Sequence, residues 1–150
     1  MTDQNKCNIR KSVRLIKRIV VHCSATREGK EFYMCDIDRW HRDEGWNGCG
    51  YHYVIDLDGK VEIGRDINIQ GAHAGKYNPK SIGICYIGGL TADGETAKDT
   101  RTDEQKESLL WLLKELRMLY PQAEILGHRD LPGVKKACPC FNAKNEYKEL

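Results

Sequence analysis

The spacing of apolar and polar residues along the chain predicts a domain in which strands and helices are interspersed. The segment from Arg18 to Cys23 is rich in β-branched residues, which is typical of a buried strand, and it would carry His22 to its carboxyl end. Further strands are predicted from alternating or continuous apolar positions at 51–57, 60–63, 82–87 and 123–127. Asp58-Gly59 separates the first two of these segments and predicts a hairpin with a two-residue type I′ turn.

Helices are predicted where capping residues precede an apolar stripe. Asp36 is expected to cap a short helix that ends near Gly45. Thr102 and Gln105 form a capping-box pattern at the start of the longest helix, which ends before Pro121. Its apolar stripe consists of the leucines at 109, 112, 113, 116 and 119. The residues from about 142 onward predict a final helix.

The order of these elements favours an α/β (mixed α+β) fold, a single domain with a central mixed β-sheet flanked by helices. Residues 1–16 are polar and are expected to form a flexible or loosely docked arm, followed by a domain over 17–150. Segments 67–79 and 90–101 lack periodicity and predict loops; the first is long enough to line a site.

Composition and charge narrow the classes of function. The chain has 150 residues with 24 Lys and Arg against 22 Asp and Glu, so its net charge of +2 gives no reason to expect a nucleic-acid partner. The longest apolar stretches fall far short of the ~20 residues that cross a bilayer, so no membrane insertion is expected. The basic amino-terminal run is followed by no apolar stretch of the secretory type, and we therefore expect synthesis in the cytoplasm.

The cysteines are expected to be free thiols or metal ligands rather than a disulfide framework. They are odd in number and follow no export signal; they stand at positions 7, 23, 35, 49, 85, 138 and 140.

A catalytic zinc ion needs three protein ligands and one open position. His22, His128 and Cys138 lie at predicted strand ends or loops and offer suitable atoms, although spacing alone does not distinguish ligands from hydrogen-bonded or buried structural residues. A thiol nucleophile at Cys23 with His22 as its base is excluded, because adjacent residues of a strand point to opposite faces.

Several dispersed motifs occur together in an order that is known from one family. They include Val21-His22-Cys23-Ser24-Ala25-Thr26, Gly50-Tyr51-His52-Tyr53, Gly71-Ala72-His73-Ala74, Gly127-His128-Arg129-Asp130 and Lys136-Ala137-Cys138-Pro139. By these motifs the chain resembles the type 2 N-acetylmuramoyl-L-alanine amidases, and within them the small lysozymes of the T-odd phages, which share their fold with peptidoglycan recognition proteins. The resemblance covers about residues 17 to 145.

The resemblance implies that His22, His128 and Cys138 are zinc ligands and that Tyr51 and Lys136 assist catalysis. It implies hydrolysis of the amide bond between N-acetylmuramic acid and L-alanine in peptidoglycan. Such a Zn²⁺-dependent enzyme, of phage or prophage type, would act on the cell wall after release. A lysine and a tyrosine suit this reaction, because both can donate hydrogen bonds to the oxygen that becomes negative as the carbonyl turns tetrahedral.

Other roles stay open at this stage. His73 is a candidate substrate contact, since the family often carries a histidine in this loop. Cys140 is a second thiol that could compete for metal. The same fold can bind muropeptides without cutting them, and relatives of this type can also bind RNA polymerase. A monomer is expected.

Overall fold

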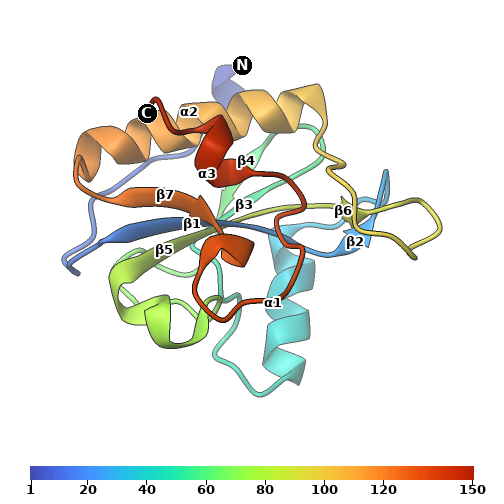
Figure 1. The fold of residues 1–150 in the computed structure, drawn as a ribbon, viewed down its shortest axis with the longest axis horizontal. Helices are drawn as coiled ribbons and strands as arrows, with labels where there is room; N and C mark the ends of the chain where they lie inside the picture. The colour runs from blue at the N-terminus through green and yellow to red at the C-terminus, as the bar shows by residue number, and fades with distance from the viewer.

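A five-stranded mixed sheet forms the centre of the computed structural model, which describes residues 1–150 (Figure 1). The strand order is β4-β3-β5-β1-β7. Strand β1 pairs in parallel with both β5 and β7, β3 pairs in parallel with β5, and β4 is antiparallel to β3. The mixed sheet of the predicted fold class is confirmed. The strands are β1 (Arg18–Cys23), β3 (Tyr53–Ile55), β4 (Val61–Ile63), β5 (Ser81–Tyr86) and β7 (Glu124–Gly127).

Helices cover both faces of this sheet. The long helix α2 (Asp103–Leu119) and the short α3 (Ala143–Glu146) pack on one face, and α1 (Met34–Asp43) packs on the other (Figure 1). The face of α1 also carries two 3₁₀ segments, η2 (Gly75–Lys80) and η3 (His128–Asp130). A third, η1 (Asp3–Asn5), lies near the amino terminus. The capping box of Thr102 and Gln105 is formed as predicted, with Gln105 N donating to Thr102 Oγ1 at 3.0 Å.

The alternation of side chains along β1 determines which face of the sheet His22 lies on. Ile19 and Val21 are fully buried in the main core cluster together with the leucines of α2. Successive side chains of a strand point to opposite faces, so Val20 and His22 face the side of η2 and η3. The core thus anchors β1 while leaving an imidazole on the other face.

Two local predictions are wrong in detail. Helix α1 begins at Met34, and Asp36 caps it from inside: its Oδ2 accepts a hydrogen bond from Tyr33 N at 2.8 Å. The hairpin turn spans Asp56 to Gly59, closed by a 2.9 Å hydrogen bond from Gly59 N to Asp56 O. Gly59 has a φ of 87° but Asp58 is not in the left-handed region, whereas a type I′ turn requires positive φ at both central residues.

The loop predicted over 90–101 overlaps at Leu90 with a short strand of a small second sheet. Strand β6 (Gly89–Leu90) pairs in parallel with β2 (Thr26–Arg27) at the edge of the molecule (Figure 1). Strands of two residues leave no periodic signal in a sequence.

The amino-terminal arm makes specific contacts with the domain. Ser12 N donates to the hydroxyl of Tyr120 at 2.7 Å, and Ser12 Oγ donates to Ile67 O at 2.8 Å.

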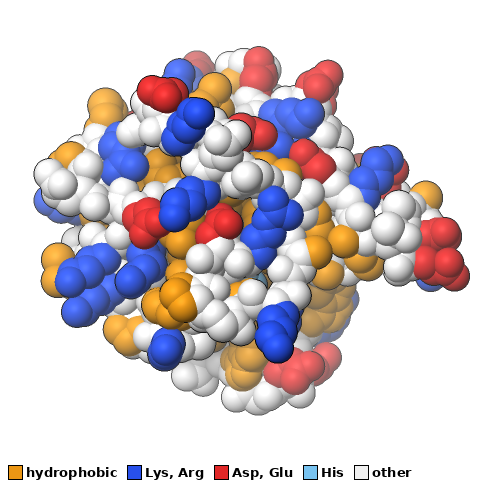
Figure 2. All heavy atoms as spheres, in the orientation of Figure 1, with side chains coloured by type: hydrophobic (Ala, Val, Ile, Leu, Met, Phe, Trp, Pro, Cys, Tyr) orange, Lys and Arg blue, Asp and Glu red, His pale blue; other side chains and the backbone are white.

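Lysine and arginine side chains share the face seen in Figure 2 with aspartate and glutamate, as the small net charge leads one to expect. None of the helices has the length and apolar character that a bilayer span requires.

Candidate active site

The largest cavity opens on the face of the sheet that carries α1. Its volume is about 600 Å³, and it lies where β1 and β7 end and where the loop ahead of η2 passes over β5. Open α/β sheets bind ligands beyond the carboxyl ends of their parallel strands, and this cavity has that position. Its polar lining includes His22, His41, Tyr51, His73, Asn78, His128, Lys136 and Cys138, and the exposed Trp46 also lines it.

Three of these residues form a cluster suited to a metal ion. Candidate ligand atoms of His22, His128 and Cys138 all lie within 4.8 Å of one another. His22 is buried at the end of β1, His128 follows β7 directly, and Cys138 comes from the loop after η3. Nδ1 is the His22 nitrogen that faces the thiol, 3.9 Å from Cys138 Sγ. Two imidazoles and one thiolate are a donor set that zinc favours.

The loop that carries Cys138 is held in place at several points. Cys23 N donates to Cys138 Sγ at 3.2 Å, and Arg129 N donates to Cys138 O at 2.8 Å. The buried hydroxyl of Tyr86 donates to Pro139 O at 2.6 Å. The thiol is therefore tied to β1, β5 and η3 together, which fixes its position relative to both histidines.

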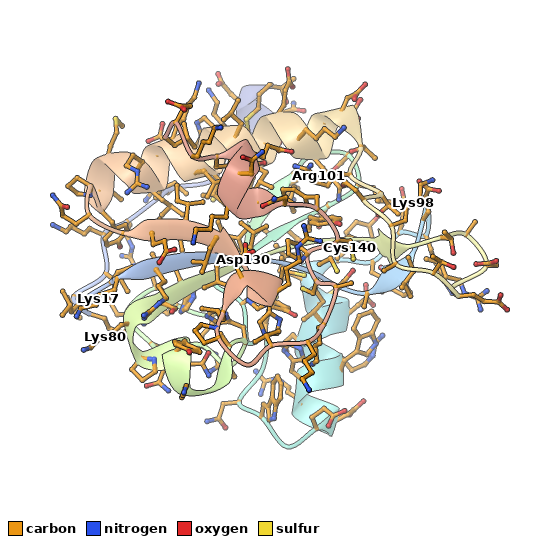
Figure 3. All side chains as sticks on the ribbon, viewed as in Figure 1. Lys17, Lys80, Lys98, Arg101, Asp130 and Cys140 are labelled. Carbon is orange, nitrogen blue, oxygen red and sulfur yellow. The ribbon has the colours of Figure 1, made fainter.

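His128 is oriented by the short 3₁₀ turn that begins with it. Asp130 Oδ2 accepts a hydrogen bond from Gly127 N at 2.8 Å, which closes η3 onto the end of β7. Figure 3 labels Asp130 on this turn and Cys140 on the following stretch, farther toward β6. Cys140 Sγ donates to Gly89 O at 3.3 Å, and its sulfur is not part of the three-residue cluster. None of the seven cysteines is joined to another in a disulfide.

Burial and neighbouring charge keep the histidines of the cavity neutral. Burial, together with His73, His128 and Lys136, holds the pKa of His22 well below its usual value of 6.5. Burial and Lys136 also lower the pKa of His128. A neutral imidazole retains the lone pair that a metal ion needs.

Tyr51 and Lys136 supply hydrogen-bond donors to the same cavity. The ring of Tyr51 lies 5.1 Å from that of His22, measured between centroids. Burial raises the pKa of Tyr51 well above 10, so its hydroxyl keeps its proton. Lys136 is exposed on the loop that also carries Cys138, and it reaches the cavity from the solvent side.

His41 and Trp46 also line the cavity, although neither is among the site residues predicted from the sequence. His41 Nδ1 accepts a hydrogen bond from Gly50 N at 2.8 Å, which leaves the proton of the neutral ring on Nε2. Trp46 is 44% exposed and packs against His41, with ring centroids 4.6 Å apart. The only hint in the sequence was a tryptophan directly after the glycine that ends a helix. An aromatic side chain that is exposed there does not contribute to the core, which is typical of a binding surface.

Comparisons with known proteins identify what this chain is similar to. A family model described as N-acetylmuramoyl-L-alanine amidase matches residues 12–141. The endolysin of Enterobacteria phage K11 is 41% identical over 128 residues, which is 85% of this chain and 83% of that protein. The endolysin of Escherichia phage T7 is 39% identical over 131 residues, covering 87% and 85%.

Solved structures show the same fold. The N-acetylmuramoyl-L-alanine amidase LysC from Clostridium intestinale URNW superimposes with a TM-score of 0.73 at 28% identity, covering 93% of this chain and 90% of that one. Wild-type Drosophila PGRP-LB superimposes with a TM-score of 0.72 at 26% identity, covering 93% and 83%.

Proposed function

This chain belongs to the N-acetylmuramoyl-L-alanine amidase family, and we propose that it hydrolyses its amide substrate with a zinc ion held by His22, His128 and Cys138. Cleavage between N-acetylmuramic acid and L-alanine degrades peptidoglycan, in keeping with the phage endolysins among its relatives. The convergence of the three ligand atoms within 4.8 Å, at the wall of the largest cavity, carries the proposal for the metal.

The residues present fit zinc by the chemistry of their donor atoms. Both imidazoles have lowered pKa values and so offer lone pairs at neutral pH. Cys23 N donates a hydrogen bond to Cys138 Sγ at 3.2 Å, which holds the sulfur beside the two imidazoles. When bound, zinc supplies a Lewis acid for an amide carbonyl and activates water at neutral pH.

Tyr51 and Lys136 act on the substrate. As the scissile carbon becomes tetrahedral, its oxygen gains negative charge, and the Tyr51 hydroxyl and the Lys136 ammonium donate hydrogen bonds to it. Tyr51 is half-buried and packs against the apolar cluster of Ile37 and Val54, so little reorganisation accompanies the reaction. Lys136 adds a full positive charge at the open side, where the substrate enters.

The cell wall is the site of action in this proposal, reached after release from the cytoplasm, and the enzyme works as a monomer. A cavity with Tyr51, Lys136 and the metal cluster together favours an enzyme over a module that only binds muropeptides. Binding to RNA polymerase stays a prediction from the resemblance.

Digestion of purified peptidoglycan tests the proposed function. Wild type should release new amino-terminal L-alanine and no new reducing sugar. Cys138→Ala should lose both the bound zinc and this activity, whereas Cys140→Ala, a thiol removed from the same loop but outside the cluster, should keep both. Full activity of Cys138→Ala would refute the zinc mechanism.

A second pair of variants tests the lysine. Lys136→Met should keep zinc and lose rate, while Lys135→Met, one residue away and outside the cavity lining, should behave as wild type. Loss of zinc from Lys136→Met, or equal effects of the two changes, would contradict the role in stabilising the oxyanion.

A further inference from the structure

Two histidines of the cavity share a hydrogen bond that the proposed reaction does not use. His22 Nε2 and His73 Nδ1 are 2.8 Å apart, and the two rings meet edge to face at 90°. A neutral imidazole has one N–H and one lone pair, so one ring donates and the other accepts. The other nitrogen of His22, Nδ1, faces Cys138 at 3.9 Å.

The fold builds a specific seat for the ring of His73. A Cβ atom at Gly83, in the middle of β5, would lie 2.7 Å from Cγ and Cδ2 of the ring, and a Cβ at Gly71 would lie 2.7 Å from Cδ2. Only glycine leaves this space. Asn78 fixes the backbone of the loop, because its Oδ1 accepts hydrogen bonds from His73 N at 3.1 Å and Ala74 N at 2.7 Å.

The second ring nitrogen of His73 makes no hydrogen bond in this position. His73 Nε2 is buried and has no hydrogen-bond partner. An unpaired buried polar atom destabilises the fold. Another interaction of the same side chain must therefore account for the buried position of the ring. The only hydrogen bond of the ring is the one to His22.

We propose that His73 is a positioning residue, whose Nδ1 accepts the Nε2–H of His22 and thereby keeps the lone pair of His22 on Nδ1, toward Cys138 and His128. The inference rests on the proposed function, because a lone pair there serves a metal ion. Histidines that bind metals generally donate their other N–H to an acceptor that sets the tautomer and the ring orientation. Here the acceptor is the neutral imidazole of His73. Because its lone pair is on Nδ1, its proton is on the buried Nε2, which has no hydrogen-bond partner. The role differs from that of a substrate contact, because it acts through His22.

Zinc affinity of the purified chain, measured by competition with a chelator, tests the inference. His73→Leu removes the acceptor, and we expect zinc binding to weaken about 10- to 100-fold. His73→Asn keeps an acceptor oxygen near the position of Nδ1, and we expect it to restore most of the affinity. His41→Leu is the matched control: it removes another histidine of the cavity, one with no hydrogen bond to His22, and should leave zinc affinity unchanged.

The tautomer can be read directly on the metal-free protein. In a long-range ¹H–¹⁵N spectrum of wild type, His22 should show a protonated Nε2 and an unprotonated Nδ1, and this pattern should be lost in His73→Leu. A protonated Nδ1 in wild type would overturn the inference. This readout does not depend on substrate or activity.

The outcomes separate this inference from the proposed function. If wild type binds zinc and His73→Leu binds it equally well but has a raised KM, His73 is a substrate contact and the positioning role is wrong. If wild type itself binds no zinc, the proposed function fails and this inference fails with it.

Discussion

His52 should make the stability of the metal-free protein depend on pH. Its side chain is 1% exposed. Nδ1 accepts a hydrogen bond from Gly83 N at 3.1 Å, and Nε2 donates to Ile69 O at 2.8 Å. A second proton would have to enter at Nδ1, against the N–H of Gly83. Burial, with an added contribution from the charge of Arg14, lowers the pKa of His52 from 6.5 to about 4.

The magnitude follows from the difference between the folded and unfolded pKa values. The unfolded chain takes up a proton as the pH falls below 6.5, whereas the folded chain does so only near pH 4. The stability due to neutral His52 is therefore complete above pH 6.5 and is lost as the pH falls toward 4. One pKa unit corresponds to about 1.4 kcal/mol, so the loss amounts to roughly 3 kcal/mol over this range.

Urea denaturation of metal-free wild type and His52→Asn, at intervals between pH 7 and pH 4, measures this loss. The variant should be less stable at pH 7, and its difference from wild type should shrink as the pH falls, because the unfolded variant has one fewer histidine to protonate. Val54→Ala, a buried change without a titrating group, should keep a constant difference. A constant difference for His52→Asn as well would show that the protonation of His52 does not make stability depend on pH.

Three further changes have defined outcomes. Tyr51→Phe should keep zinc and lower kcat about 10²- to 10³-fold in a peptidoglycan digest, because one donor to the oxyanion is lost; an unchanged kcat would remove Tyr51 from the mechanism. Leu112 is fully buried between α2 and the sheet, so Leu112→Ala should lower the free energy of unfolding by about 2–5 kcal/mol, measured in urea. A loss below about 1 kcal/mol would mean that neighbouring core side chains fill the space left by the deleted atoms. Gly83→Ala should weaken zinc binding in chelator competition, since the new Cβ would press on the ring of His73, and wild-type affinity would show that this seat is not needed.

The sequence predicted the elements whose signals are local and repeated. Strand β1 has the predicted bounds, and α2 starts after Thr102 and ends at Leu119 as its capping box and leucine stripe indicate. The turn at Asp58-Gly59 was misjudged because the same dipeptide suits several turn types, and the closing hydrogen bond from Gly59 to Asp56 decides between them.

The site was less accessible to sequence reasoning because its parts lie far apart in the chain. His22 and His128 are brought together only by the pairing of β1 with β7, and their spacing in the sequence carries no signal of this pairing. The cluster was therefore predicted from a family resemblance and not from the periodicity of apolar residues. The contact between His22 and His73 depends on two glycines that make room for a ring, and such close approach becomes visible only in three dimensions.

X-ray absorption spectroscopy of the zinc-loaded protein identifies the atoms around the metal and therefore measures the proposed ligand set itself. We expect one sulfur at about 2.3 Å and two imidazole nitrogens at about 2.0–2.1 Å, with the remaining position left to a light atom from solvent. The same shell, with its single sulfur, should persist in Cys140→Ala, because Cys140 lies outside the cluster. A shell without sulfur, or one with two sulfurs, would contradict a site built from His22, His128 and Cys138.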